Sequence, residues 1–545
     1  MPFNVAAINE AVTAAVPERE ALVYRDRRFT YAQLADRANR LANVLLAHDV
    51  TVQHEREGLA NWESGQDHVA LYMYNCNEYL EGMLGGFKAR AAPFNVNYRY
   101  VAEELVYLLH DAQTTAIIYQ ACFAATLAPL LQDLPGIKLL LQVDDGSDVP
   151  LLPGALDYEQ ALASTSGMRP DVELDDDDLY ILYTGGTTGM PKGVLWRQAD
   201  CAVANLGGRW PDGRVVESLD GFRQRAEKSR GLRIMPASPF MHGAGSYVSF
   251  NAWGWGNTVI IQDETQRFDA HSVLATCARE RASMLLTIGD AFGRPLLEAA
   301  RSGRHDLSSI SIVMNTGAIL SDAVKDGLID VIPGLRISDS LGTSETGPQG
   351  NVISDAGSAG EKSRFRLMPD AEVLSADLKS ILKPGDDELG WLVKRNFVPL
   401  GYLGDQAKTE ATFPVVDGDR YVIGGDRVRL LADGVLEYHG RESFTINSGG
   451  EKIFAEEVEI AIKHHPDIID VVVVGRPSER WGNEVVAIIQ ARGQNPDRDN
   501  ILQEAAKHVA RYKLPKAFRF VEHLQRQPNG KTDYDWAVNS AKEAT

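Results

Sequence analysis

One short segment of the chain concentrates the chemical groups that bind phosphate oxygens. Residues 183–193 read Tyr-Thr-Gly-Gly-Thr-Thr-Gly-Met-Pro-Lys-Gly, and the lysine is Lys192. Glycines let a backbone approach a ligand closely, and successive N–H groups with hydroxyls and a lysine can surround a phosphate. The pattern differs from a Walker A loop, because Pro191 precedes the lysine and Gly193 follows it. A plain Gly/Thr turn between two strands is the alternative, and the density of glycines and hydroxyls favours phosphate binding.

A second polar cluster lies at residues 337–347, which read Ile-Ser-Asp-Ser-Leu-Gly-Thr-Ser-Glu-Thr-Gly. Glu345 is the glutamate of this cluster, and hydroxyl side chains flank it on both sides. Mg²⁺ is commonly bound by one or two carboxylates together with the phosphates of a nucleotide. Combined with the phosphate-binding segment, this cluster indicates a site for a nucleotide and its metal ion.

Two further features suit the sugar and the base of a nucleotide. Asp426 could accept hydrogen bonds from both ribose hydroxyls, and Arg441 could support the sugar or a phosphate. An exposed ion pair on a hairpin is the alternative. Gly317 and Ala318 end an apolar strand and leave room for a flat ring, although a tight connection between a strand and a helix would use the same small residues.

Composition excludes several classes of protein. The chain has 545 residues with a formal net charge of −20, which disfavours general binding to nucleic acid or to anionic membranes. The four cysteines form no CxxC pair, which is typical of reduced thiols in the cytoplasm. We see no signal peptide and no apolar stretch of the roughly 20 residues that a membrane span requires. We therefore expect a cytoplasmic protein.

The elements that must position these residues alternate between strands and helices. Residues 68–73 and 93–97 have the composition of buried strands, and residues 78–89 between them are expected to form a helix. Such alternation predicts an α/β fold with parallel, helix-covered sheets. Residues 50–67 are polar and without periodicity, which indicates an inserted surface loop. The aspartate run 175–178 is interpreted as a solvated turn, because four consecutive side chains do not converge on a metal ion.

The chain resembles the adenylate-forming superfamily of acyl-CoA synthetases, luciferases and adenylation domains of peptide synthetases. The resemblance rests on the segments quoted above and on a Pro-x-Gly-Lys element at residues 528–531, and it covers residues 20–535. Within the superfamily, the chain most resembles actinobacterial acyl-CoA synthetases, including those that act on steroid side chains. Leu341 stands where the family usually has tyrosine, and Ser443 where the hinge is often aspartate or lysine.

The resemblance implies roles for individual residues. ATP contacts are expected from Thr184, Gly185, Gly186, Thr187, Thr188, Gly189, Lys192, Gly317, Ala318, Ser340, Leu341, Gly342, Thr343, Ser344, Asp426, Arg441 and Lys531. The CoA tunnel is expected along Ser448, Gly449, Gly450, Glu451 and Lys452. Catalytic roles are expected for Lys531, Glu345 and Lys192. Glu345 would also be the metal ligand, His242 would line the acyl pocket, and Ser443 would be the hinge.

The resemblance further implies a large N-terminal domain over residues 1–442, with helix-covered sheets and a small β-barrel-like subdomain. A mobile C-terminal α/β domain over residues 443–545 would carry the catalytic lysine and the CoA-tunnel segment. The implied activity uses ATP and Mg²⁺ to convert a fatty or steroid side-chain acid to acyl-AMP, and then transfers the acyl group to CoA. A fatty-acyl-AMP ligase, a luciferase-like oxygenase, a peptide-synthetase adenylation unit and a nucleotide sensor are the alternatives, and a homodimer is the default expectation.

Overall fold

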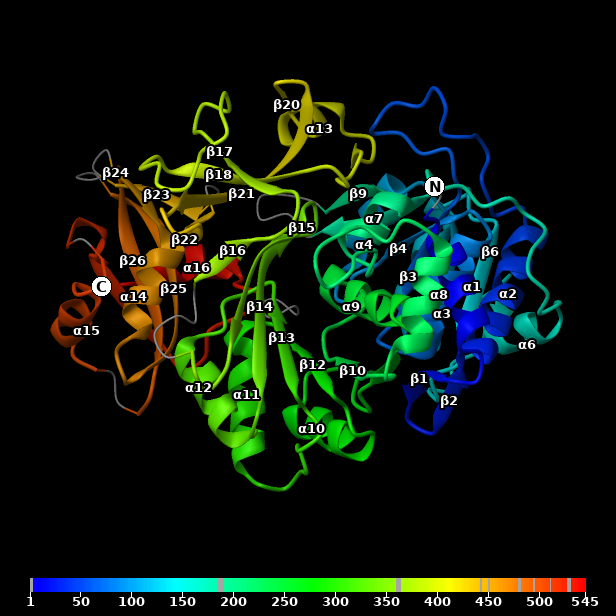
Figure 1. Ribbon diagram of the computed structural model, residues 1–545, viewed down its shortest axis with the longest axis horizontal. Coiled ribbons are helices and arrows are strands. Elements are labelled where there is room, and N and C mark those ends of the chain that lie inside the picture. Colours follow the sequence, from blue (N-terminus) through cyan, green and yellow to red (C-terminus); the bar gives the residue numbers. More distant parts are fainter. Residues whose placement is uncertain are drawn as a thin grey trace. The chain divides into compact units, whose positions relative to one another are not determined.

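The computed structural model describes residues 3–184, 191–358, 364–441, 444–448, 451–478, 482–493, 496–509, 511–526 and 531–545 (Figure 1). The chain divides into two compact units. Unit 1 comprises residues 1–363, 368–370 and 394–422, and unit 2 comprises residues 364–367, 371–393 and 423–545. Each unit is described by itself. The predicted domain boundary after residue 442 falls within unit 2 and stays a prediction.

Unit 1 contains two sheets. The first has, in spatial order, β19 (Gly401–Tyr402), β9 (Lys192–Arg197), β8 (Leu179–Thr184), β4 (Ala92–Asn95), β3 (His68–Tyr72), β5 (Thr114–Gln120), β6 (Leu139–Val143) and β7 (Leu156–Asp157). Strands β8, β4, β3, β5 and β6 run parallel, whereas β9 pairs antiparallel with both β8 and β19. The parallel core matches the strand–helix alternation of the sequence.

The second sheet of unit 1 has, in spatial order, β15 (Gly347–Ser354), β14 (Arg336–Thr343), β13 (Ile312–Thr316), β12 (Met284–Thr287), β10 (Arg233–Pro236), β11 (Thr258–Ile261), β1 (Glu20–Tyr24) and β2 (Arg27–Thr30). The central strands from β14 to β1 pair in parallel. In each of these two sheets, the carboxyl ends of the parallel strands lie along one edge, and the loops that follow them can carry functional groups.

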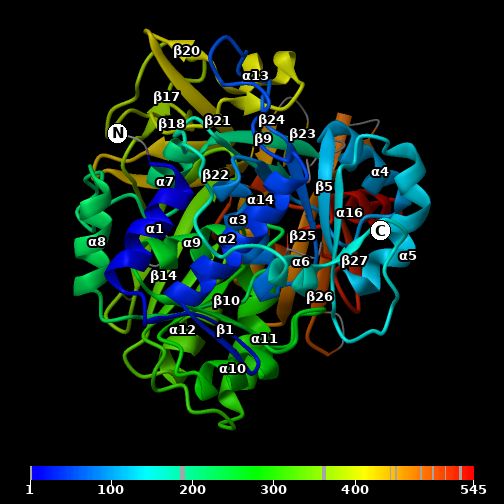
Figure 2. The same cartoon turned by 90° about the vertical axis from the view of Figure 1, so that its right-hand side faces the viewer.

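The helices of unit 1 are α1 (Val5–Ala15), α2 (Tyr31–Ala47), α3 (Asn77–Lys88), α4 (Ala102–Asp111), α5 (Ala124–Leu127), α6 (Tyr158–Ala163), α7 (Gln198–Ala204), α8 (Leu219–Lys228), α9 (Gly243–Gly254), α10 (Ala270–Arg279), α11 (Gly289–Arg301), α12 (Asp322–Val331) and α13 (Gln406–Thr412). Helices α1, α2, α3 and α9 share one apolar core with strands of both sheets. Helices α10, α11 and α12 cover the other face of the second sheet. Helices α4 and α5 cover the other face of the first sheet, beside β5 in Figure 2.

Strand β3 illustrates why the sheets need helices on both faces. Val69 and Leu71 point into the core shared with α1–α3, and Ala70 and Tyr72 point into the core under α4 and α5. Side chains alternate along a strand, so a strand that is apolar throughout must be covered on both sides. The buried-strand prediction for this segment is confirmed.

Unit 2 contains two further sheets. The first has the order β17 (Ala371–Leu374), β18 (Gly390–Arg395), β21 (Asp419–Leu430), β22 (Val435–Arg441) and β16 (Phe365–Leu367). Strand β20 (Val415–Val416) belongs to unit 1, and it pairs with Asp419 and Arg420 at the start of β21, which also fall in unit 1. These strands form an open sheet, so the expected barrel-like subdomain is not closed among the described strands. In the part of unit 2 that the structure describes, β16 and β17 do not pair with each other, and closure would require such a pair.

The second sheet of unit 2 has the order β24 (Glu451–Phe454), β23 (Thr445–Ser448), β26 (Gly482–Ala491) and β25 (Ile468–Ser478), and β27 (Ala517–Val521) pairs with β26. Helices α14 (Ala455–Lys463) and α15 (Arg498–Ala505) share an apolar core with one face of this sheet. Helix α16 (Tyr534–Ala541) packs on the other face. The predicted small α/β arrangement near the C-terminus is present.

Candidate active site

The phosphate-binding segment begins and ends on an antiparallel pair of strands in unit 1. Thr184 ends β8 and pairs with Lys192, which begins β9. Residues 185–190, which include the expected ATP contacts Gly185, Gly186, Thr187, Thr188 and Gly189, lie outside the described residues. Strand pairing therefore fixes both ends of the segment, and the backbone of Lys192 lies opposite that of Thr184.

Asn95 is a buried residue that organises the edge of the sheet beside this segment. Its side-chain amide donates to the carbonyl oxygens of Tyr183, at 2.8 Å, and of Met241, at 2.6 Å, and its Oδ1 accepts from the N–H of Tyr183 at 2.7 Å. Met241 directly precedes His242, which is the N-cap residue of α9 and is half-buried. The strand that leads into the phosphate segment is thus tied to the predicted acyl-pocket residue. Sequence reasoning missed Asn95, because a single asparagine after a strand carries no distinctive signal.

The turn that is predicted to contact adenine follows β13 and contains the small residues Gly317 and Ala318. Gly317 adopts a φ of +76°, which suits glycine. Asn315 donates to the carbonyl of Ala318 at 3.0 Å and to Asp339 at 2.7 Å, which fixes the turn against β14. Ser340 on β14 pairs with Thr316 at this same edge.

The predicted metal ligand lies on the turn that joins β14 to β15. The backbone N–H of Glu345 donates to the Thr343 hydroxyl at 3.2 Å, and the Thr346 hydroxyl accepts from the N–H of Thr343 at 2.9 Å. The indole N–H of Trp196, on β9, donates to the Ser344 carbonyl at 3.1 Å. The turn is therefore anchored both within itself and on the strand that begins with Lys192.

Tyr402 on β19 holds the carboxylate of Glu345. Its hydroxyl donates to Oε1 of Glu345 at 3.0 Å, and its side chain is buried. Burial, together with the charge of Glu345, raises the pKa of the tyrosine, so the hydroxyl stays protonated and remains a donor. In the described part of the chain, no donor reaches Oε2 of Glu345. A carboxylate with one oxygen held and the other open fits the coordination of one hard cation such as Mg²⁺.

Asp405 holds the predicted phosphate-binding lysine. Its Oδ2 accepts from the ammonium of Lys192, and its Oδ1 accepts from the N–H of Lys408 at 2.9 Å as the N-cap of α13. The hydrogen bond with Lys192 lowers the pKa of the Asp405 carboxyl. Tyr402 and Asp405 are three residues apart, so one short segment contacts both predicted groups. No local pattern indicates these contacts, since a Gly-Tyr-Leu-Gly-Asp run resembles an ordinary turn.

The predicted ribose contacts lie on facing positions of β21 and β22 in unit 2. Asp426 pairs in register with Arg441, whose Nε donates to its Oδ1 at 3.1 Å. The Tyr438 hydroxyl donates to the same oxygen at 3.2 Å. Asp426 is fully buried, and its Oδ2 has no hydrogen-bond partner among the described residues. A buried, unsatisfied carboxylate oxygen is costly, and a ligand hydroxyl would satisfy it.

A buried glutamate lies next to this pair. Glu456 is in the first turn of α14, and a Cβ added to Gly440 would come within 2.5 Å of its Oε2. Burial raises the pKa of Glu456 to about 8, with repulsion from Glu459 as the next cause. Glu456 is therefore mostly protonated at neutral pH, and it adds little negative charge beside Asp426.

The remaining predicted residues of unit 2 are described only in part. Ser448 ends β23 and pairs with Glu451 and with Gly482. Lys531 is exposed and directly precedes Thr532, which forms an antiparallel bridge with Arg526. Five expected residues lie wholly or in their side chains outside the described part of the chain: Ser443, Gly449, Gly450, Glu451 and Lys452. The hinge and tunnel roles stay predictions.

Comparison with known proteins identifies the family. The chain matches the AMP-binding enzyme family over residues 9–395 and the AMP-binding enzyme C-terminal domain over residues 457–531. It is 48% identical over 541 residues to the medium-chain acyl-CoA ligase Mig of Mycobacterium avium, covering 99% of this chain and 98% of the relative. It is 38% identical to the 3-oxocholest-4-en-26-oate–CoA ligase of Rhodococcus rhodochrous, covering 98% and 96% of the two chains.

A solved structure supports the same fold. ATP-bound MatB from Rhodopseudomonas palustris matches with a TM-score of 0.81 and 21% identity, over 100% of this chain and 99% of that chain. The chain belongs to the AMP-binding enzyme family, and the resemblance to the adenylate-forming superfamily is confirmed. Among the residues that the structure describes, no helix has the length and apolar character needed to cross a membrane.

Proposed function

We propose that this protein is an AMP-forming acyl-CoA ligase that acts on medium-chain fatty acids. The similarity to a medium-chain acyl-CoA ligase, at 48% identity over nearly the whole of both chains, carries the proposal. Steroid side-chain acids are the second candidate substrates, because a ligase for 3-oxocholest-4-en-26-oate is 38% identical.

The proposed reaction has two steps. A carboxylate oxygen attacks the α-phosphorus of ATP and forms an acyl-AMP mixed anhydride, with pyrophosphate as the leaving group. The thiol of CoA then attacks the acyl carbon, loses its proton and displaces AMP. Both steps need alignment of the reacting groups and stabilisation of charge, because carboxylate oxygen is a poor leaving group whereas AMP is a good one.

The residues of unit 1 would bind the nucleotide. Lys192 would neutralise the outer phosphates, with the turn at Gly317 and Ala318 against the adenine. Glu345 would hold Mg²⁺ through its open oxygen, and the ion, when bound, would neutralise phosphate charge. Asp405 would hold the ammonium group of Lys192 in place until a phosphate of ATP binds that ammonium group. His242 would lie beside the acyl carboxylate.

The residues of unit 2 would complete the site. Asp426 would accept the ribose hydroxyls through the oxygen that has no described partner, with Arg441 and Tyr438 fixing its orientation. Lys531 would donate to the reacting carboxylate and α-phosphate during the first step. Ser448 and its neighbours would line the path of the CoA arm, and Ser443 would be the hinge.

A substrate panel tests the proposed function. Pyrophosphate release should be measured with saturated acids from C2 to C18 and with a cholesterol side-chain acid, with and without CoA, and the products identified by mass spectrometry. We expect maximal release and acyl-CoA formation near C8–C12. Acyl-AMP that accumulates without acyl-CoA would favour the fatty-acyl-AMP ligase instead, and failure to exchange pyrophosphate with every acid would overturn the proposal.

The role of Lys531 can be tested by separating the two steps. Lys531→Ala should lower acyl-AMP formation by about 10²–10³-fold, because it removes a donor that stabilises charge in the transition state. Thioester formation from supplied acyl-AMP should stay within about two-fold of wild type. Lys542→Ala, which changes a surface lysine on the same terminal segment, is the matched control. Equal loss in both steps would reject the assignment.

A further inference from the structure

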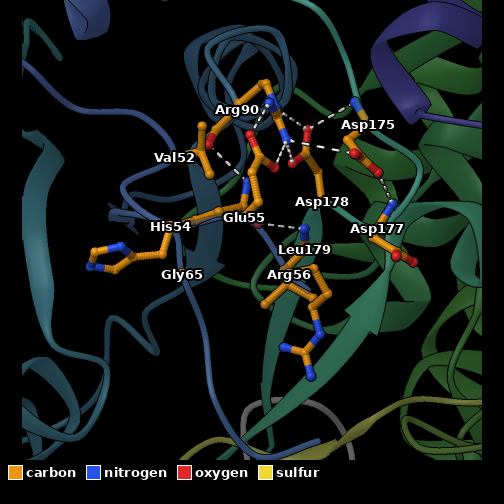
Figure 3. A pocket seen from close by; sticks show the side chains of 11 residues that line it. Val52, His54, Glu55, Arg56, Gly65, Arg90, Asp175, Asp177, Asp178 and Leu179 are labelled. Atoms are coloured by element: carbon orange, nitrogen blue, oxygen red, sulfur yellow. Dashed lines mark hydrogen bonds and ion pairs between the residues drawn. The ribbon is translucent and has the colours of Figure 1, made fainter. Parts of the chain in front are cut away.

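The polar loop at residues 50–67 is tied through the exposed Glu55 to Arg90, which also pairs with the buried Asp178. Arg90 donates to both carboxylate oxygens of Glu55, at 2.9 and 2.8 Å, and to those of Asp178 at 3.0–3.2 Å. Figure 3 shows Glu55 and Asp178 turned toward the guanidinium of Arg90. Asp178 is itself buried, so the prediction that the aspartate run is a solvated turn is wrong at this residue. Burial next to an arginine explains why this position is an aspartate.

This cluster connects the 50–67 loop to Arg90 and to Asp178, the residue before β8, and it leaves no room for a ligand. The cavity beside it, which His54, Arg56 and Asp177 also line, has a volume of about 10 Å³. That volume holds about one water molecule. Gln66, at the end of the loop, donates to the Arg90 carbonyl at 2.7 Å and accepts from the N–H of Leu179 at 2.6 Å. The loop is thereby tied to the first residue of β8.

The tip of the loop is closed by its own arginine. Arg56 donates to the carbonyl oxygens of Glu63, at 2.5 Å, and of Ala60, at 2.6 Å. The guanidinium is partly buried among these acceptors, and this burial lowers the pKa of Arg56. The Glu63 carboxylate in turn accepts from the N–H of Ala60 at 2.8 Å. These bonds give a loop without helix or strand a defined shape at residues 56–63.

The closed tip lies against the segment at residues 401–405. The Trp62 carbonyl accepts from the N–H of Gly404 at 2.8 Å. A Cβ added to Gly401 would approach the Asn61 carbonyl oxygen to 3.1 Å and the Thr409 side chain to 2.4 Å. The loop backbone therefore packs directly on the segment that carries Tyr402, which contacts Glu345, and Asp405, which contacts Lys192.

We propose that the 50–67 loop and Tyr402 form a positioning device for the nucleotide site: the loop holds residues 401–405 in place, and Tyr402 aims the carboxylate of Glu345 at the metal ion of Mg·ATP. This inference rests on the proposed function of Glu345 and Lys192. Its contacts all lie within unit 1. Tyr402 is a positioning residue, because it touches the metal ligand and not the reacting atoms. Partners that orient a metal ligand in this way commonly change affinity for the metal about 10–100-fold when they are removed.

The first test removes one hydroxyl. Tyr402→Phe keeps the buried ring and deletes the hydrogen bond to Glu345. Titration calorimetry should show affinity for Mg·ATP weakened about 10-fold, while affinity for ATP in the presence of a chelator stays unchanged. Tyr158→Phe is the matched control, since the buried Tyr158 hydroxyl likewise donates to a carboxylate, that of Glu81 at 2.9 Å. We expect the control to leave both affinities at the wild-type value.

The second test addresses the loop without changing the site. Arg56→Met removes the donors that close the tip, and Arg214→Met, at an exposed arginine, is its control. Hydrogen exchange at the Gly404 amide should become about 10-fold faster in the Arg56 variant only. Affinity for Mg·ATP should weaken about 3-fold. The double variant Arg56→Met/Tyr402→Phe should be no weaker than Tyr402→Phe alone, because both changes act through one segment.

The outcomes separate this inference from the proposed function. Equal weakening of Mg·ATP and metal-free ATP by Tyr402→Phe would overturn the role of Tyr402 as a partner of the metal ligand. Wild-type exchange at Gly404 in Arg56→Met, or additive effects in the double variant, would overturn the role of the loop. Neither readout needs an acid substrate. A failure of the substrate panel would therefore leave the nucleotide measurements interpretable.

Discussion

Two carboxylates, one in each unit, are predicted to contact the same nucleotide, and they are built differently. Each accepts a hydrogen bond from a tyrosine on one oxygen, Glu345 from Tyr402 at 3.0 Å and Asp426 from Tyr438 at 3.2 Å. Asp426 is fully buried and also forms an ion pair with Arg441. Glu345 is half-buried, and in the described part of the chain no arginine or lysine forms an ion pair with it.

The difference matches two kinds of ligand. A carboxylate that must bind a cation keeps its charge unneutralised and one oxygen open. A carboxylate that accepts neutral hydroxyls can be buried beside an arginine, because the hydroxyls require an acceptor and not a net charge. We therefore expect the same type of hydrogen bond from a tyrosine to support cation binding at Glu345 and hydroxyl binding at Asp426, with the neighbouring charges making the difference.

The largest expected effect comes from Glu345. Glu345→Gln keeps the size of the side chain and its bond with Tyr402 but removes the charge, and we expect adenylation to fall by about 10²–10³-fold. Metal-free ATP should bind as it does to wild type, as measured by calorimetry. Glu437→Gln, at a more exposed glutamate that pairs with Arg429, is the control. Wild-type rates in Glu345→Gln would end the assignment of this residue as the metal ligand.

Asp426 should behave differently in the same assays. Asp426→Asn keeps an acceptor for Tyr438 but lowers the charge beside Arg441, so the KM for ATP should rise about 10-fold, with or without excess metal. The free energy of unfolding should fall by about 1–3 kcal/mol, since a buried charged hydrogen bond is lost. Calorimetry and denaturant unfolding measure the two effects. A purely metal-dependent loss of affinity would contradict the distinction between the carboxylates.

Glu456, which lies beside the Asp426 site, should make the free energy of unfolding depend on pH. Its folded pKa of about 8 lies above the ordinary value of 4.5, so its contribution to stability is fully present below about pH 4.5 and is lost as pH rises through 8. Glu456→Gln should therefore unfold at a midpoint about 2 °C or more above wild type at pH 8.5, and the difference should shrink toward pH 5. Thermal unfolding across this range measures it. Parallel curves for the two proteins would show that Glu456 does not titrate on folding.

The smallest effect is expected at the second tyrosine. Tyr438→Phe removes a donor from a carboxylate oxygen that Arg441 also contacts, so affinity for ATP should change by no more than about 3-fold. Any change should be the same with Mg²⁺ and with a chelator, in contrast to Tyr402→Phe. Calorimetry under both conditions checks this. A metal-dependent effect at Tyr438 would mean that the two tyrosines do not serve separate purposes.

Much of the fold follows from local patterns in the sequence. The strands at residues 68–72 and 92–95 and the helix between them were predictable, because short apolar runs that alternate with a longer helical segment are typical of buried parallel strands. The open sheet of unit 2 was not predictable as open, since closure depends on whether edge strands from distant segments pair. The buried Asp178 was missed because its partner, Arg90, is 88 residues away.

The sequence by itself determined which chemical groups are available for the predicted site: the glycines, hydroxyls and lysine of the segment that ends at Lys192, the carboxylate of Glu345, and the pair Asp426 and Arg441. Residue type and short spacing carry that information, because each motif lies on one turn or one hairpin. Only the tertiary structure decided how these groups are held. Tyr402 and Glu345 are 57 residues apart in the sequence, and Trp62 and Gly404 are several hundred apart. The pairing of β9 with β19 holds the 401–405 segment where it makes these contacts. Contacts between segments so far apart depend on the packing of the whole unit, and no local pattern encodes them.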